Sequence, residues 1–284
     1  MFKNYYRLTK PGIVYGNLLT TLAAYLYASY WHVHWLNFLA TLVGLGLVIA
    51  SACVFNNYLD RDIDAKMERT KDRSLAAGII SNDMAILYGC ILCLFGFVLL
   101  ICFVNIVSSV IALIGFLVYV FAYTFLKRMT AWATEIGSIA GATPIVVGYT
   151  AVTDKLDITA VLLFVILVMW QMPHFYAIAV RRSGEYAAAG IPVLPIVSGA
   201  PETKLRMLFY IFAFAVAIFL LTFLGYAGYW FLVITEIATL VWFWRSAEGF
   251  GASENVTWAF RAFVVSLVVL VVFCVMLSIA LLIP

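Results

Sequence analysis

Three side chains that carry oxygen ligands follow one another at intervals of four residues near the end of an apolar stretch: Asn56, Asp60 and Asp64. In an α-helix this spacing puts them on one face, with a rise of about 6 Å per step. Two carboxylates on one face repel each other unless a cation lies between them. Mg²⁺ takes one or two carboxylates and completes its coordination with water and substrate phosphate. The spacing therefore predicts a magnesium site, whereas Asp62 lies off this face.

Three basic residues follow the acidic segment directly: Arg69, Lys71 and Arg73. Guanidinium and ammonium groups bind phosphate oxygens through charge-assisted hydrogen bonds. Together the two segments predict a site for a metal-bound diphosphate. A solvated loop of mixed charge is the alternative for the basic segment. It does not explain the acidic face, because acidic residues at membrane depth usually serve a function.

The composition indicates which elements position these residues. Of the 284 residues 65% are hydrophobic and 11% are charged, whereas ordinary domains have about 45–50% apolar and about 25% charged residues. The excess must face lipid, and only helices of roughly 20 apolar residues satisfy their backbone while crossing a bilayer here. We predict an all-α integral membrane protein with nine spans, near residues 11–30, 37–57, 84–104, 107–126, 132–152, 158–180, 206–226, 229–246 and 262–283.

The basic residues are distributed unevenly between the two sides of such a bundle. Sixteen of the 17 Lys and Arg residues fall on the side of the N-terminus, and Lys155 alone falls on the other. The positive-inside rule then predicts a cytoplasmic N-terminus and a periplasmic C-terminus. Neither a signal peptide nor a transit peptide precedes the first span, which favours a bacterial inner membrane. We expect one membrane domain over residues 1–284 and no nucleic-acid partner.

The acidic motif N-x-x-x-D-x-x-x-D resembles the first signature of the UbiA superfamily of intramembrane prenyltransferases. Further segments are similar to the haem-farnesylating branch of that superfamily, and they cover nearly the whole chain. They read TKPGIVYGN (Thr9–Asn17), DRDIDAKMERTKDRSL (Asp60–Leu75), YTFLKR (Tyr123–Arg128), WQMPHFYAIA (Trp170–Ala179) and EYAAAGIPVLP (Glu185–Pro195).

The resemblance implies a helical bundle around a central cavity, with cytoplasmic loops capping the active site. It also implies a reaction in which the farnesyl group of farnesyl diphosphate joins a vinyl group of protohaem (haem b), giving haem O and diphosphate. Mg²⁺ is the implied cofactor, and a haem-handling protein or a haem A synthase is an expected partner. Two alternatives stay open: transfer to another aromatic or tetrapyrrole acceptor, and a secondary transporter. A transporter should gather its polar residues near the midplane, whereas here they gather at one boundary.

The resemblance also assigns single residues. Tyr123 and Lys127 match a Y-x-x-x-K element expected on the diphosphate, with Lys127 catalytic beside Asp60 and Asp64. An interfacial tyrosine with a snorkelling lysine is the alternative.

Other superfamily members carry a second D-x-x-x-D, whose positions are Arg182 and Tyr186 here. Either the first motif mainly holds the metal, or Arg181 and Arg182 replace a second metal by binding phosphate directly, which we favour. His174 is the candidate for the haem iron or a haem propionate, with a purely structural role as the alternative.

Overall fold

The computed structural model describes residues 2–284 and consists of helices joined by loops, with no strand in that range. The elements are α1 (Phe2–Leu8), α2 (Pro11–Ser29), α3 (Trp35–Asp64), α4 (Asn82–Phe103), α5 (Ile106–Leu117), the π-helical η1 (Val118–Tyr123), α6 (Thr124–Leu126), α7 (Ala133–Thr153), α8 (Ile158–Arg181), α9 (Ser183–Ala188), α10 (Leu194–Val197), α11 (Gly199–Phe223), α12 (Tyr229–Ala247), the 3-10 turn η2 (Glu248–Gly251) and α13 (Asn255–Ile279).

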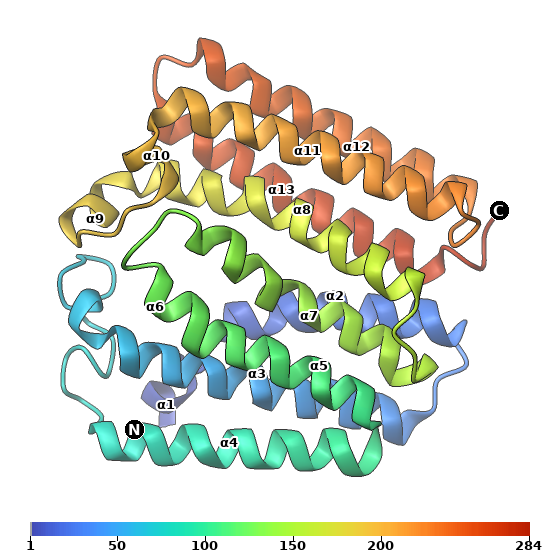
Figure 1. Cartoon of the computed structure of the whole chain (residues 1–284), viewed down its shortest axis with the longest axis horizontal. Helices are drawn as coiled ribbons and strands as arrows, with labels where there is room; N and C mark the ends of the chain where they lie inside the picture. The colour runs from blue at the N-terminus through green and yellow to red at the C-terminus, as the bar shows by residue number, and fades with distance from the viewer. Residues whose placement is uncertain (1) are drawn as a thin grey trace.

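The long helices lie side by side with similar tilt (Figure 1). Within residues 2–284, seven helical runs are long and apolar enough to cross a membrane: α3, α4, the continuous run Ile106–Leu126, α7, α8, α11 and α13. The other two predicted spans coincide with α2 and α12, which are helical but less apolar. Polar side chains lower the mean hydropathy of both helices. They are Asn17 and two adjacent threonines in α2, and Glu236 and Arg245 in α12.

Helices α11 and α13 each begin seven residues before the predicted spans 206–226 and 262–283, and two further differences from the predicted spans concern the site. First, α3 runs seven residues past the predicted end at residue 57 and reaches Asp64 without a break, so the whole acidic motif lies on one helix. Second, the predicted span 107–126 contains the π-helical segment η1. A π-turn inserts an extra residue into a helix and is frequent at functional sites.

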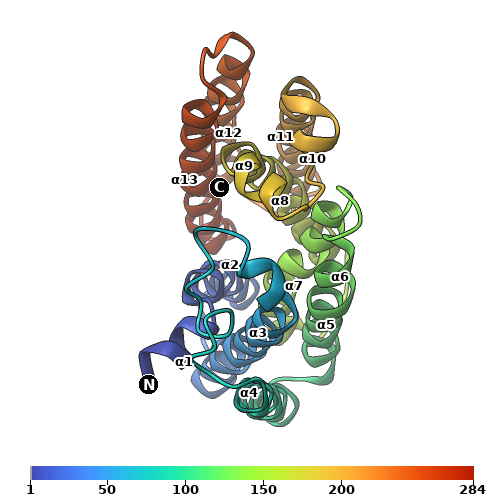
Figure 2. The same ribbon diagram turned by 90° about the vertical axis from the view of Figure 1, so that its left-hand side faces the viewer.

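Helices α2 to α7 form one half of the molecule, and α8 with α11, α12 and α13 forms the other (Figures 1 and 2). Close backbone approach joins neighbouring helices in the first half. A Cβ on Gly96 would lie 2.8 Å from the carbonyl oxygen of Gly44, and a Cβ on Gly148 would lie 2.2 Å from that of Thr21. Small residues at such crossings are the usual means of packing helices in lipid.

The short helices α9 and α10 and the loop after α3 gather at one end of the bundle, which faces the viewer in Figure 2. Most charged side chains of the predicted site come from this end, because α3, α6 and α8 all terminate there. The fold thus brings segments far apart in the sequence to one end of the two halves.

Candidate active site

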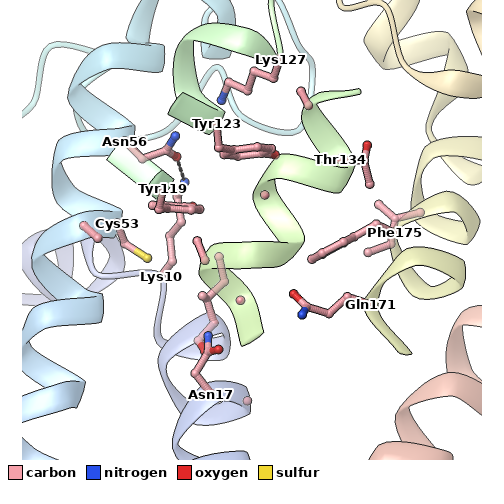
Figure 3. A pocket seen from close by; sticks show the side chains of 18 of the residues that line it. Lys10, Asn17, Cys53, Asn56, Tyr119, Tyr123, Lys127, Thr134, Gln171 and Phe175 are labelled. Atoms are coloured by element: carbon pink, nitrogen blue, oxygen red, sulfur yellow. Dashed lines mark hydrogen bonds between the residues drawn. The ribbon is translucent and has the colours of Figure 1, made fainter. Parts of the chain in front are cut away.

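A cavity of about 530 Å³ lies between the two halves of the bundle. Its walls come from α2, α3, α5, η1, α7, α8 and α13, and the segments around Met67 and Ile191 contribute at the end where α9 lies. Away from that end the lining is mostly apolar and includes Leu45, Val48, Leu167 and Leu270. In Figure 3, Lys10, Cys53 and Asn56 lie across the cavity from Gln171 and Phe175 of α8.

The acidic face of α3 forms part of this wall. Asn56, Asp60 and Asp64 all line the cavity, and their exposed fractions are 2%, 3% and 3%. Asp62 is exposed outside the lining, where Arg128 donates two hydrogen bonds of 2.8 Å to its carboxylate. The four-residue spacing therefore does separate three buried oxygen donors from the fourth acidic group.

Each of the three buried residues has a cationic partner. The Lys127 ammonium pairs with Asp60 Oδ2, and Arg73 Nη1 donates to both oxygens of Asp64 at 2.9 and 2.7 Å. The Lys10 ammonium donates to Asn56 Oδ1, as the dashed line in Figure 3 shows. The side-chain amide of Asn56 in turn donates to Thr124 Oγ1 at 2.9 Å. Three cationic side chains thus contact two carboxylates and one neutral amide at the polar end of the cavity.

One carboxylate oxygen at this end lacks a hydrogen-bond donor. Asp60 Oδ1 is buried and has no hydrogen-bond partner, and the Arg128 guanidinium lies 3.9 Å away from it. A buried unsatisfied carboxylate oxygen is costly, and a hard cation would satisfy it. Within residues 2–284 no three His, Cys, Asp or Glu side chains cluster. The donor set of two carboxylates and one amide fits Mg²⁺ that takes further oxygens from phosphate.

Lys10 is a site residue that the sequence analysis did not identify. It precedes α2 with a left-handed backbone (φ 49°, ψ 64°), which costs a non-glycine residue about 1–2 kcal/mol. The Asn57 side chain donates to the backbone oxygen of Leu8 at 2.8 Å and ties this segment to α3. Burial lowers the pKa of Lys10 to about 8, although the Asp60 charge opposes that shift. The sequence feature that could have identified Lys10 is the T-K-P-G motif at the start of the first apolar stretch.

The π-helical segment positions the Y-x-x-x-K pair. Its rings Tyr119 and Tyr123 both line the cavity and stack 5.5 Å apart, and the Lys127 ammonium lies 5.5 Å above the Tyr123 ring. On α7, Gly137 leaves room for that ring, since a Cβ there would lie 2.7 Å from Tyr123 Cδ2. Burial lowers the pKa of Lys127, and the neighbouring Asp60 partly offsets this.

The other predicted diphosphate ligands divide into two groups. Arg69 lines the cavity and lies 3.4 Å from Glu185. Three residues do not belong to the lining: Lys71 pairs with Glu68 at 2.6 Å, Arg182 pairs with Glu185 at 3.2 Å, and the Arg181 guanidinium lies over the ring of Phe260. The structure thus brings Arg69 and Arg73 to the cavity with Lys127, and leaves the arginine pair at its rim.

His174 lines the opposite wall and is 9% exposed. Its neighbour on α8, Gln171, also lines the cavity and was not identified from the sequence. Gln171 donates to the backbone oxygens of Ser138 and Leu167, and a Cβ on Gly141 would lie 2.0 Å from its Oε1. The glycine therefore allows α7 and α8 to approach at this wall.

Comparison with known proteins gives the relationship of this chain. Proteins named "Protoheme IX farnesyltransferase" from Cronobacter sakazakii and Edwardsiella ictaluri are both 45% identical, over 285 and 280 aligned positions. These alignments cover 100% and 98% of this chain and 97% and 95% of the relatives. The sequence model of the UbiA prenyltransferase family matches residues 17–268.

Solved structures show the same fold. A structure described for digeranylgeranylglyceryl phosphate synthase superimposes with a TM-score of 0.81 at 20% identity, covering 98% of both chains. A UbiA homologue from Archaeoglobus fulgidus bound to GPP and Mg²⁺ superimposes with a TM-score of 0.71 at 15% identity, covering 97% of this chain and 99% of the other. The family model matches most of the residues, and the named relatives align along the whole or nearly the whole chain. The chain therefore belongs to the UbiA prenyltransferase family.

Proposed function

We propose that this protein transfers the farnesyl group of farnesyl diphosphate to a vinyl group of protohaem, giving haem O and diphosphate. The relatives named "Protoheme IX farnesyltransferase" support the reaction, because they are 45% identical along the full chain. The observation that carries it is a single cavity with buried Asp60 and Asp64 among cations at one end and an apolar interior. Such a cavity suits a substrate that joins a diphosphate to a long hydrocarbon.

The polar end of the cavity is the proposed diphosphate site, with Asn56, Asp60 and Asp64 as the residues that would hold Mg²⁺. The metal would supply Lewis-acid neutralisation of the departing diphosphate. Lys10, Arg73 and Lys127 contact these three residues and lie where they can bind phosphate oxygens. Preorganised positive groups stabilise the negative charge that develops on the leaving group.

We assign Arg69 and Tyr123 to the same diphosphate site, since both line the cavity. Lys71, Arg181 and Arg182 stay predictions from the sequence, and their positions outside the lining do not support direct contact. The His174 wall is the proposed acceptor side.

The reaction breaks the bond between farnesyl C1 and the diphosphate oxygen. The vinyl double bond supplies the electron pair of the new carbon–carbon bond, and a water molecule adds to the carbon left cationic and loses one proton. The allylic cation must meet the vinyl group before it meets water, and the apolar lining keeps bulk water out. Leu45, Val48 and Leu167 form part of that lining and are all 2% exposed or less.

Product analysis tests this function. Purified protein in lipid nanodiscs is incubated with protohaem, farnesyl diphosphate and Mg²⁺, and haem is separated by chromatography and weighed by mass spectrometry. We expect a more apolar haem that has gained one farnesyl and one hydroxyl group, and no product when Mg²⁺ is chelated. Farnesylation of another aromatic compound but not of protohaem would overturn the acceptor assignment, and a transporter would form no covalent product.

The proposed topology has nine membrane crossings, with α2 and α12 included, a cytoplasmic N-terminus and a periplasmic C-terminus in a bacterial inner membrane. The distribution of basic residues supports this orientation. Among the described residues, Lys155, between α7 and α8, is the one basic residue at the end of the bundle away from the proposed site. Membrane association with a haem-handling protein or a haem A synthase remains a prediction from the sequence.

Reporter fusions test the topology. A fusion after Lys71 should be active on the cytoplasmic side, and a fusion after Pro284 should be active on the periplasmic side. The reason is that Lys71 follows two of the nine proposed crossings and so returns to the side of the N-terminus, whereas Pro284 follows all nine. Alkaline phosphatase and green fluorescent protein report the two sides independently. The same side for both fusions would contradict the nine-crossing topology.

A further inference from the structure

The hydrogen bonds of Ser266 determine which nitrogen of His174 carries a proton. Ser266 lies on α13, and its Oγ is 2.6 Å from the backbone oxygen of Phe263 and 2.8 Å from His174 Nδ1. A backbone oxygen only accepts, so the hydroxyl proton is donated to Phe263. A hydroxyl has one proton and two lone pairs. Ser266 can therefore only accept from His174, and Nδ1 is the protonated nitrogen.

The second ring nitrogen, Nε2, is then left with a free lone pair. In a neutral imidazole one nitrogen donates and the other accepts. No group within residues 2–284 hydrogen-bonds to Nε2, and that atom is not sealed inside the protein. Because His174 lines the cavity together with Leu267 and Leu270 of α13, the lone pair is available to a bound substrate.

The ring is also held in orientation. It stacks on Trp170 with centroids 4.7 Å apart and packs on Phe263 with centroids 4.9 Å apart. The Trp170 indole donates to the backbone oxygen of Ser266 at 2.9 Å, so the stacking ring is attached to the same residue that fixes the tautomer. Both Ser266 and Trp170 are buried. Rotation of the imidazole would break both its hydrogen bond with Ser266 and its stacking on Trp170.

These contacts distinguish the two roles that the sequence predicted for His174. A propionate carboxylate offers only acceptor oxygens, so it forms no hydrogen bond with an unprotonated Nε2. The iron of haem, in contrast, binds the lone pair of a neutral imidazole, and the other ring nitrogen of such a ligand usually donates to a neighbouring group. We infer that His174 binds the haem iron through Nε2 and that Ser266 is the positioning residue that fixes its tautomer. The inference rests on the proposed function, since it requires protohaem as the acceptor.

Porphyrin titration of the full-length protein in nanodiscs tests the inference. The probes are protohaem and metal-free protoporphyrin IX, followed by their absorption bands. We expect a nitrogen-ligated haem spectrum in the wild type. His174→Ala should lose it, with the Kd for protohaem raised by at least about 10-fold and the Kd for protoporphyrin unchanged. Ser266→Ala should raise the Kd for protohaem by about 10-fold, because outer partners of metal ligands typically have this effect. Added imidazole should restore the ligated spectrum of His174→Ala.

Ser109→Ala is the matched control, because Ser109 is a buried membrane-helix serine whose hydroxyl bonds only to Asn105 in the same segment. It should leave both titrations unchanged. An unaltered protohaem spectrum in His174→Ala, or an equal loss of both porphyrins, would overturn iron ligation while haem O formation by the wild type still stood. Failure of the wild type to bind or farnesylate protohaem would instead overturn the proposed function, and the inference with it.

Discussion

Asp60→Asn and Asp64→Asn are each expected to lower the rate of farnesyl transfer by about 10³-fold. In the proposed site, loss of either charge would weaken metal-dependent stabilisation of the leaving diphosphate. Such stabilisation is worth several kcal/mol, and each 1.36 kcal/mol corresponds to a factor of ten in rate. Asparagine keeps the volume of the side chain in a wall where both residues are 3% exposed. The rate is measured as haem O formed per minute at saturating protohaem.

Asp62→Asn is the matched control on the same helix. Asp62 lies outside the cavity lining and pairs with Arg128, so its replacement should change the rate by less than about threefold, in line with the small contribution of exposed ion pairs. Thermal unfolding and size-exclusion chromatography check that all variants fold. Equal loss from Asp62→Asn would mean that proximity to the acidic segment, rather than the cavity face of α3, determines activity.

Lys10→Ala is expected to lower kcat/KM for farnesyl diphosphate by about 10²-fold, a typical effect of removing one preorganised donor from a developing anion. Among the described residues, four cations line the cavity, and three of them have carboxylate partners: Arg69 with Glu185, Arg73 with Asp64 and Lys127 with Asp60. Within those residues the Lys10 ammonium hydrogen-bonds to the neutral Asn56 amide and has no carboxylate partner. Its charge is thus available to phosphate without breaking an ion pair.

Two further variants sharpen the Lys10 experiment. Lys10→Arg keeps the positive charge and should retain more activity than Lys10→Ala. Lys66→Ala removes an exposed lysine from the loop after α3 and should change neither kcat nor KM. Calorimetry with a non-hydrolysable farnesyl diphosphate analogue should show weaker binding for Lys10→Ala alone. Normal analogue binding by that variant would remove Lys10 from the diphosphate site.

Local spacing and hydrophobicity allowed much of this protein to be predicted. Apolar stretches of about 20 residues predict membrane helices because the bilayer leaves the backbone no other way to pair. The predicted ranges coincide with long helices of the structure. The four-residue spacing of Asn56, Asp60 and Asp64 depends only on the helical repeat, so the shared cavity face followed from the sequence. The family resemblance rested on motifs of the same local kind.

Tertiary structure alone decided which other side chains meet at the cavity. Lys10 and Asn56 are 46 positions apart, and His174 and Ser266 are 92 apart. No local pattern specifies such pairs, because they arise from the packing of one helix against another. For the same reason the sequence could not place Arg181, whose guanidinium lies over the ring of Phe260, which is distant in the sequence. The sequence thus determined the helices and their polar faces, and the packing of the helices, both within and between the two halves, determined which side chains share the cavity.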